Sequence, residues 1–291
     1  MNVTSTSNGA VVNAYARWRP ALAIRLSGWW HAACLIALIA RPAWWPWVLG
    51  ALAANHAVIS LAVLWPRGRW LGPNLIRLPA AAVARAEVSL TFDDGPDPLV
   101  TPHVLDLLDR YGATASFFCV GEKAAAHPEI ITTIVRRGHS VENHTNRHPL
   151  AFAFFGITAL RREIEAAQTV LAGIAGRAPL FFRAPAGFRS PLLDPVLARC
   201  GLRYVSWTRR GYDAVRHDPQ QILRSLTQDL AAGDLLVLHD GAHVRTEEGV
   251  PVVLAVLPAL LEELKTRGLK SVALPAACGE YSTAVPVATA A

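Results

Sequence analysis

Beyond Pro79 the chain alternates short apolar strands with helical segments, and this alternation limits its possible folds more than any other feature. Strand-like segments lie at 87–92, 115–120, 139–142, 179–183, 204–207, 234–238 and 270–274. Helical patterns separate them at 101–111, 122–137, 158–172, 191–200, 219–232 and 250–267. Strict alternation with short connections predicts a parallel sheet with right-handed crossovers. The α/β fold expected is an incomplete or irregular (β/α) barrel, with a doubly wound open sheet as the alternative.

Two uncharged apolar runs precede this region, at 26–40 and 43–65. The second run is long enough to cross a bilayer, which takes about 20 residues. The first reaches that length if it begins near Ala21 and Arg25 extends its charge to the headgroups. Eight of the nine tryptophans lie at or before Trp70, and they cluster at the edges of both runs, as membrane-interface residues do. The sequence therefore predicts an N-terminal hydrophobic hairpin of two membrane helices.

Two other interpretations of these runs stay open. A cleaved signal peptide would have one shorter apolar core and a small-residue cleavage site. A soluble helical hairpin would be buried against the domain. Asn55, His56 and Ser60 are polar for a membrane span, and we expect them to face the partner helix.

The net charge of +6 comes mostly from arginines that flank the hairpin, since only Arg41 lies in its turn. The flanking residues are Arg17, Arg19, Arg25, Arg67, Arg69, Arg77 and Arg85. The positive-inside rule then places the N-terminus and the large domain in the cytoplasm, at an inner or plasma membrane. No run of five like charges and no aromatic–basic stripe is present, so we expect no nucleic-acid partner. Four cysteines without a CxxC spacing predict no disulfide framework.

These features divide the chain into five expected parts. They are an N-terminal tail at 1–20, two membrane helices at 21–70, a linker at 71–85, a catalytic domain at 86–275 and a disordered tail at 276–291.

Two adjacent carboxylates, Asp93 and Asp94, end the first predicted strand in "SLTFDDGPDP". Neighbouring anions repel each other, and in a strand their side chains point to opposite faces. The pair therefore indicates either a solvent-exposed turn or a bound cation. His144 and His148 follow the third strand in "NHTNRHP", where a spacing of four puts both imidazoles on one face of a helical turn. Two imidazoles and one carboxylate suit a divalent transition metal and leave positions open. The other carboxylate then stays ionised near the metal and can accept a proton.

Four motifs in order, "TFDDGPDP", "NHTNRHP", "FRAPAG" and "LLVLHDG", resemble the polysaccharide deacetylase family, which is also called the NodB-homology or carbohydrate esterase 4 group. The resemblance covers residues 86–274, about two-thirds of the chain. It implies a distorted (β/α) barrel and the metal-dependent removal of an acyl group from an amino sugar.

The resemblance also implies a role for each matched residue. The metal would be held by Asp94, His144 and His148, and zinc is the expected ion, with cobalt, nickel, manganese and iron as alternatives. The catalytic residues would be Asp93 as general base, His239 as general acid and Arg183, which would pair with Asp93 and orient it. The non-catalytic alternatives are that Arg183 forms only a structural salt bridge and that His239 only caps the end of its strand.

The sequence departs from the family pattern near the expected sugar pocket. Ala186 stands where the family usually has an aromatic residue, within the predicted substrate-binding turn of Pro185, Ala186 and Gly187. The chain near Ala186 is also expected to supply a backbone donor for an oxyanion. The family's motif of two aspartates and a tryptophan is not evident, but "SWTRRGYDAV" offers Trp207 for substrate binding and Asp213 to orient and tune His239.

The function expected is that of a membrane-anchored, metal-dependent hydrolase that removes an N-acyl group, normally acetyl, from an amino sugar. The saccharide could be a polymer, an oligomer or lipid-linked, and membrane lipid is the second expected partner. A deformylase of a lipid-linked amino sugar is the nearest variant. A non-catalytic, membrane-tethered carbohydrate-binding protein is the alternative from a different class.

Overall fold

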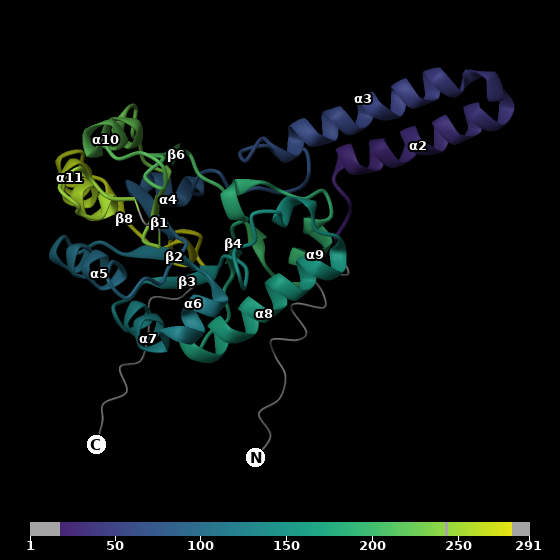
Figure 1. The fold of residues 1–291 in the computed structure, drawn as a ribbon. Helices are drawn as coiled ribbons and strands as arrows, with labels where there is room; N and C mark the ends of the chain where they lie inside the picture. The colour runs from purple at the N-terminus through teal and green to yellow at the C-terminus, as the bar shows by residue number, and fades with distance from the viewer. Residues whose placement is uncertain (1–17, 242–243, 281–291) are drawn as a thin grey trace, which may run out of the picture.

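The computed structural model describes residues 18–241 and 244–280, and its centre is a curled parallel sheet (Figure 1). The strand order is β5-β4-β3-β2-β1-β7-β6, and β8 pairs with β1 beside this path. The strands are β1 Glu87–Asp93, β2 Ala115–Cys119, β3 Ser140–Asn143, β4 Phe181–Phe182, β5 Arg203–Tyr204, β6 Arg209–Arg210, β7 Leu235–His239 and β8 Lys270–Ser271. The end strands β5 and β6 do not pair with each other, so the predicted incomplete barrel is confirmed.

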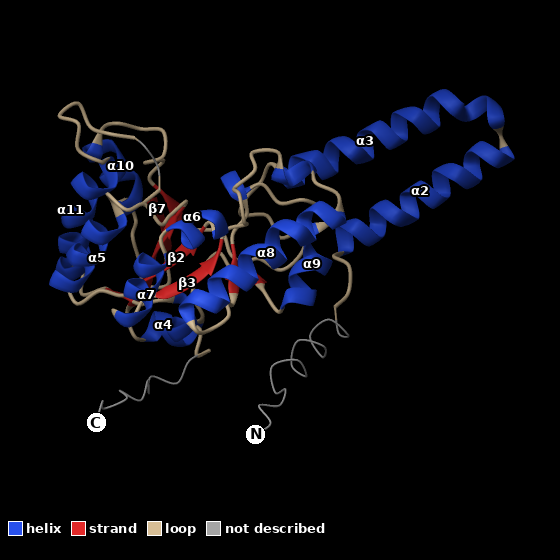
Figure 2. Cartoon of the chain, turned by 60° about the horizontal axis from the view of Figure 1, so that its bottom comes forward, coloured by secondary structure: helices blue, strands red, loops and turns tan. Residues whose placement is uncertain are grey.

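Helices enclose this sheet, as Figure 2 shows for β2, β3 and β7. They are α4 Ala80–Ala84, α5 Thr101–Arg110, α6 Gly121–Ala126, α7 Pro128–Arg136, α8 Ile157–Ala175, α9 Leu193–Cys200, α10 Pro219–Thr227, α11 Val252–Thr266 and α12 Leu274–Ala277. Short 3₁₀ turns lie at η1 Pro42–Trp44, η2 Phe152–Phe154 and η3 Pro185–Gly187. The predicted single helix 122–137 is wrong: it is broken at His127, because Pro128 has no N–H to continue the ladder and begins a new helix.

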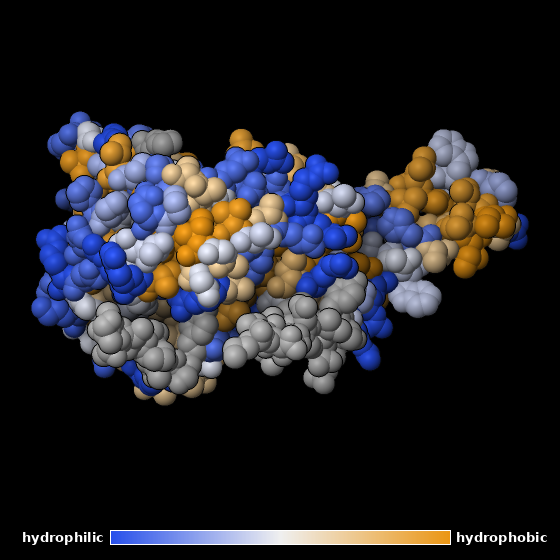
Figure 3. Space-filling model, turned by 90° about the horizontal axis from the view of Figure 1, so that it is seen from below, coloured by the Kyte–Doolittle hydropathy of each residue, from blue (hydrophilic) through white to orange (hydrophobic). Residues whose placement is uncertain are grey.

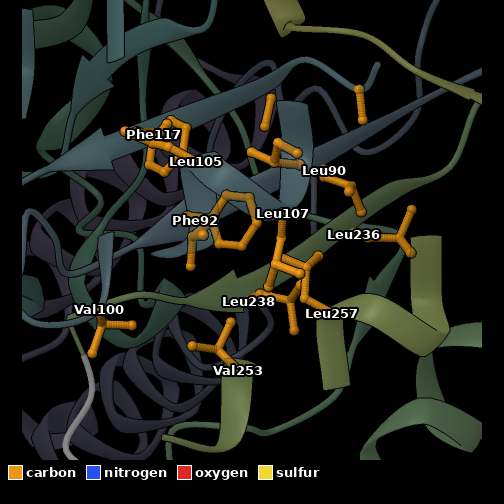
Figure 4. Packing of buried hydrophobic residues seen from close by; sticks show 14 of the residues in the cluster. Leu90, Phe92, Val100, Leu105, Leu107, Phe117, Leu236, Leu238, Val253 and Leu257 are labelled. Carbon is orange, nitrogen blue, oxygen red and sulfur yellow. The ribbon is translucent and has the colours of Figure 1, made fainter. Parts of the chain in front are cut away.

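The main core lies between the central strands and α5, α10 and α11. Every residue of β1 is buried, as expected of a central parallel strand covered on both faces. Leu90 and Phe92 pack in one cluster with Leu236 and Leu257 (Figure 4). The rings of Phe92 and Phe117 stack with centroids 5.0 Å apart. This packing fixes the carboxyl ends of β1 and β7, where the polar motifs begin.

The segment 71–85, predicted as a linker, fills the open seam of the barrel. Leu75 forms a parallel bridge with Val205, and its N–H donates to the carbonyl of Tyr204 at 3.0 Å. Leu78 is buried in a small cluster with Phe181 and Val205. The predicted strand 204–207 is therefore only partly formed: β5 ends at Tyr204, Val205 forms the bridge to Leu75, and residues 206–207 belong to no strand. The next strand, β6, pairs with β7.

Two long helices, α2 Leu22–Ala40 and α3 Trp45–Val63, form a hairpin that projects from the domain (Figure 1). The predicted hydrophobic hairpin is thus present. Its surface is largely apolar, as the orange arm of Figure 3 shows, and Trp47 is 79% exposed. Only 6% and 11% of the apolar windows at Leu22–Ala40 and Pro42–Val63 are buried. A hairpin buried within a soluble domain does not describe this structure.

Polar groups of the hairpin pair between its two helices. Asn55 Nδ2 donates to Ser27 Oγ at 2.9 Å, and the rings of His31 and His56 meet edge to face with centroids 5.2 Å apart. These contacts confirm that Asn55 and His56 face the partner helix.

The two predicted tails lie mostly outside the described residues, which leave out 1–17 and 281–291. Within the predicted tail 276–291, Ala277 belongs to α12 and is buried.

Candidate active site

Asp93 and Asp94 line the same cavity although they are neighbours in the chain. Asp93 is the last residue of β1, whereas Asp94 has a left-handed backbone with φ of 71°. This turn departs from the strand geometry that would send the two side chains to opposite faces. A side chain on Gly241 would collide with the Asp94 backbone, because an ideal Cβ there lies 2.0 Å from the Asp94 carbonyl oxygen. The glycine after His239-Asp240 therefore makes room for the turn.

Asp94, His144 and His148 each offer one ligand atom, and these atoms all lie within 4.8 Å of one another. Asp94 Oδ1 lies 3.2 Å from His144 Nε2 and 3.1 Å from His148 Nε2. Bonds of about 2.1 Å to one cation place neighbouring ligand atoms roughly 3 Å apart, so the spacing fits a shared ion. Burial raises the pKa of Asp94, but hydrogen bonds to the two histidines outweigh this effect and lower the pKa well below its usual range.

The orientation of His144 also suits a metal ligand. Its Nδ1 donates to the carbonyl oxygen of Arg183 at 2.8 Å, which directs Nε2 at Asp94 and turns this nitrogen toward the position that a cation would take. A backbone acceptor of this kind fixes the tautomer of metal-binding histidines.

The two histidines lie on a loop, so the predicted helical turn is wrong. Thr145 and His148 both have positive φ, 68° and 53°. Asn143 Oδ1 accepts from the Thr145 N–H, and Thr145 Oγ1 accepts from the His148 N–H. These side-chain bonds replace the helical ladder and hold the loop in an irregular shape that still brings both imidazoles to Asp94.

Arg183 lies fully buried behind Asp93. Its Nη1 donates to Asp93 Oδ1 at 2.5 Å and to Thr91 Oγ1 at 2.8 Å, and its Nη2 donates to the carbonyl of Ser206 at 2.9 Å. The guanidinium also lies 4.1 Å from the ring centroid of Phe118. Asp93 is therefore held in one orientation by a charge-assisted bond.

His239, at the end of β7, is held at two points by Asp213. Asp213 Oδ1 lies 2.9 Å from His239 Nδ1, and Oδ2 accepts from the His239 backbone N–H at 2.7 Å. Burial lowers the pKa of His239, but the carboxylate of Asp213, with those of Asp93 and Asp94, outweighs this and raises it to about 9. The imidazole is therefore protonated at neutral pH and can donate a proton through Nε2.

The cavity between these groups has a volume of about 260 Å³. Of the residues expected to bind substrate, Ala186, Gly187 and Trp207 line this cavity, whereas Pro185 is buried in η3 and does not line it. Gly187 has φ of 79°, and an ideal Cβ there would lie 2.4 Å from the Trp207 ring. The turn therefore brings its backbone close to the indole.

Sequence reasoning gave no role to five further residues of the cavity wall: Leu150, Arg210, Ala214, Val215 and Val237. The Arg210 guanidinium lies over the Trp207 ring, 4.9 Å from its centroid. Leu150 and Val215 are 88% and 69% exposed, and they give the mouth an apolar rim. The available signal was position, because Arg210 and Val215 lie in the same stretch as Trp207 and Asp213.

Carboxylates and imidazoles thus gather where β1, β3 and β7 end, at the carboxyl edge of a curled parallel barrel. This fold and site define a hydrolase of the NodB-homology type. A family model described as polysaccharide deacetylase matches residues 81–205. The chain belongs to the polysaccharide deacetylase family and is a hydrolase of the N-deacetylase type, which acts on carbon–nitrogen bonds.

Three relatives support this assignment. The chain is 31% identical over 192 residues to a peptidoglycan-N-acetylglucosamine deacetylase of Bacillus cereus, across 64% of this chain and 84% of that protein. It is 33% identical over 164 residues to a chitooligosaccharide deacetylase of Sinorhizobium fredii, across 56% of this chain and 76% of that protein. A crystal structure of the peptidoglycan N-acetylglucosamine deacetylase Bc1960 superposes with a TM-score of 0.64 at 28% identity, across 71% of this chain and 92% of that one.

Proposed function

We propose that this protein is a metal-dependent deacetylase that removes the acetyl group from N-acetylglucosamine units of a saccharide. One observation carries the proposal: the Asp94–His144–His148 cluster shares its cavity with Asp93 and His239. Each of these last two has a buried partner that orients it. A non-catalytic binding protein would need neither pair.

The donor set fits a divalent transition metal such as zinc. The two imidazole nitrogens and the carboxylate oxygen lie close enough together to bind one ion. Three protein ligands leave further coordination positions for water and substrate. A cation held there supplies the positive charge that polarises an amide carbonyl and acidifies water.

Asp93 and His239 divide the proton transfers between them. Asp93 takes a proton from the attacking water, and Arg183 keeps its carboxylate aimed at the cavity. His239 gives its proton to the amine nitrogen when the C–N bond breaks, because an unprotonated amine is a poor leaving group. The turn at Ala186 and Gly187 lies on the cavity wall, and we assign to it the backbone donor for the developing oxyanion.

The substrate class follows from what the relatives share. Their names specify peptidoglycan N-acetylglucosamine and chitooligosaccharides, both of which contain N-acetylated glucosamine. The exposed apolar rim and the small Ala186 give this chain a wider mouth than an aromatic residue at that position would leave.

We further propose that α2 and α3 anchor the catalytic domain to a membrane with the domain on the cytoplasmic side. Both helices are long and apolar enough to span a membrane, and every arginine of this segment except Arg41 is on the side of the hairpin's open end in the sequence. A reporter fused to the C-terminus should be active in the cytoplasm. Activity confined to the outside would reverse the orientation, and recovery of a soluble chain cleaved near residue 40 would support a signal sequence.

The proposed reaction is tested by acid release from purified full-length protein. N-acetylated chitooligosaccharides and peptidoglycan fragments, with N-formylated counterparts, form the panel. We expect acetate as the main product. Formate alone would change the acyl group assigned, and stoichiometric metal without any release across the panel would favour a binding protein.

A further inference from the structure

A second hollow, which we call the hairpin groove, lies at the base of α2 and α3. It has a volume of about 520 Å³, and its walls include Leu22, Leu26, Trp30, Val58, Arg69 and Trp70. It shares no lining residue with the catalytic cavity. Its walls are mostly apolar, and an exposed guanidinium, that of Arg69, lies at its edge.

The charge of the groove lining is positive, because Arg69 is the only charged residue among the described residues that line it. Residues 1–86 as a whole contain eight arginines and no lysine, aspartate or glutamate, so they carry +8, and the rest of the chain carries −2 of the net +6. The acidic residue nearest to Arg69 in the sequence is Glu87. An anion in the groove therefore meets Arg69, and no carboxylate of the described residues lines the groove with it. The nearby Asp194, which lies against Gly72, is paired with Arg189.

The segment that follows α3 joins the groove to the catalytic cavity. Pro66 packs behind Gly187, where an ideal Cβ would lie 3.2 Å from Pro66 Cβ. Arg67 Nη1 donates to the carbonyl of Thr208 at 3.3 Å, next to Trp207 of the cavity wall. Gly187 and Trp207 thus line the catalytic cavity, and Gly187 and the residue after Trp207 contact the segment that follows α3.

A series of hydrogen bonds links the segment that follows α3 to Asp93, the proposed general base. Asn74 Nδ2 donates to the carbonyl of Pro66 at 2.9 Å, and Ser206 Oγ donates to Asn74 Oδ1 at 3.0 Å. The Ser206 carbonyl accepts from Arg183, which holds Asp93. The segment that borders the hairpin groove is therefore connected by hydrogen bonds to the residues that hold Asp93.

We propose that the hairpin groove binds the hydrocarbon chain of a lipid that carries the sugar substrate through a phosphate or diphosphate. The chain lies along α2 and α3, the phosphate contacts Arg69 and Arg67, and the N-acetylated sugar enters the catalytic cavity. This inference rests on the proposed function and specifies its substrate. Water adds to the acetyl carbonyl, the C–N bond breaks, acetate leaves, the sugar keeps a protonated amine, and the sugar–phosphate bond stays intact.

Lipid is the occupant that the surroundings favour. The groove opens between two helices whose exposed surfaces are apolar and long enough to cross a bilayer, so a hydrocarbon chain reaches it without leaving the membrane. A hydrocarbon chain matches the walls and a phosphate matches the arginines. A second copy of this chain would bring the same positive charge to the groove and be repelled.

The test uses the full-length protein in detergent with two substrates. One is N-acetylglucosaminyl diphosphate on a long hydrocarbon chain, and the other is a soluble N-acetylated chitooligosaccharide. We expect kcat/KM to favour the lipid-linked substrate. Arg69→Gln and Ala23→Trp, which fills the groove, should each lower the ratio of the two kcat/KM values by about tenfold, a loss on the scale of one charge-assisted contact. Matched changes in the distal half of the hairpin, Arg41→Gln and Ile36→Trp, should keep the wild-type ratio.

The outcomes separate this inference from the proposed function. Turnover of the oligosaccharide with no preference for the lipid-linked substrate, or a ratio unchanged by both groove variants, overturns the inference and leaves the deacetylase. Binding is also tested without catalysis, by photolabelling with a long-chain alkyl phosphate that carries a photoreactive group. Labels concentrated at 22–30 and 69–70, and reduced by Arg69→Gln, support the groove. Labels spread evenly along the hairpin contradict it, whatever the activity.

Discussion

At the residue scale, the adjacent carboxylates Asp93 and Asp94 acquire different partners from one backbone turn. Asp93 stays in the strand against Arg183, and the positive φ of Asp94 directs its carboxylate to the two histidines. Asp93→Asn should lower turnover by about 10²–10⁴-fold, the usual contribution of a general base, and leave metal bound. Asp94→Asn is the matched control and should lose metal. Elemental analysis beside acetate release measures both, and loss of metal from Asp93→Asn would reverse the roles assigned to the pair.

His239 gives the second prediction at this scale. A group whose pKa is raised to about 9 is protonated at neutral pH and loses its proton as the pH rises through that value. Activity that needs the protonated imidazole should therefore fall on the alkaline side. Asp213→Asn removes the main charge that raises this pKa, so the alkaline limb of the kcat/KM profile should move to lower pH. A limb at the same pH in both proteins would mean that another group sets it.

At the element scale, the seam segment 71–85 connects the hairpin to the residues behind the catalytic cavity. Asn74 is 6% exposed and bonds Pro66, Gly68 and Ser206. Asn74→Ala should cost about 1–3 kcal/mol of stability, because buried partners lose their bonds. It should also lower kcat more than it changes KM, since Ser206 positions Arg183. Thr208→Val is the control, because it breaks hydrogen bonds to Ile76 and Leu235 but leaves the Asn74–Ser206–Arg183 contacts intact. Equal losses of kcat in both variants would mean that Asn74 has only a structural role.

Elements with strong local patterns were predictable, and those set by tertiary contact were not. The alternation of strands and helices gave the barrel because the central strands β1, β2 and β7 are rich in apolar residues and are separated by helical patterns. The seam was missed because Leu75 and Leu78 have no periodic pattern and find their backbone hydrogen-bond partners more than 120 residues away. The residues of the metal cluster followed from their motifs, but the loop conformation of His144 and His148 did not, because Asn143 and Thr145 side chains decide it.

At the scale of the whole molecule, the hairpin and the barrel meet through the seam segment, which belongs structurally to the barrel. A chain that starts at residue 71 should fold, stay soluble and deacetylate a soluble oligosaccharide. A chain that starts at residue 86 lacks Leu75 and Leu78 and exposes the open edge between β5 and β6, so it should unfold at lower temperature or aggregate. Thermal unfolding of the two shortened chains compares them directly. Equal melting temperatures would show that the seam contributes nothing to the barrel.

Metal titration of the metal-free protein tests the central claim most directly. Chelated protein should release no acetate from an N-acetylated chitooligosaccharide, and one equivalent of a divalent transition metal should restore full activity. His144→Ala and His148→Ala should each fail to recover under the same titration, because each removes a ligand that lies near Asp94. Full acetate release from the chelated wild-type protein, or recovery of both histidine variants with one equivalent, would contradict the account.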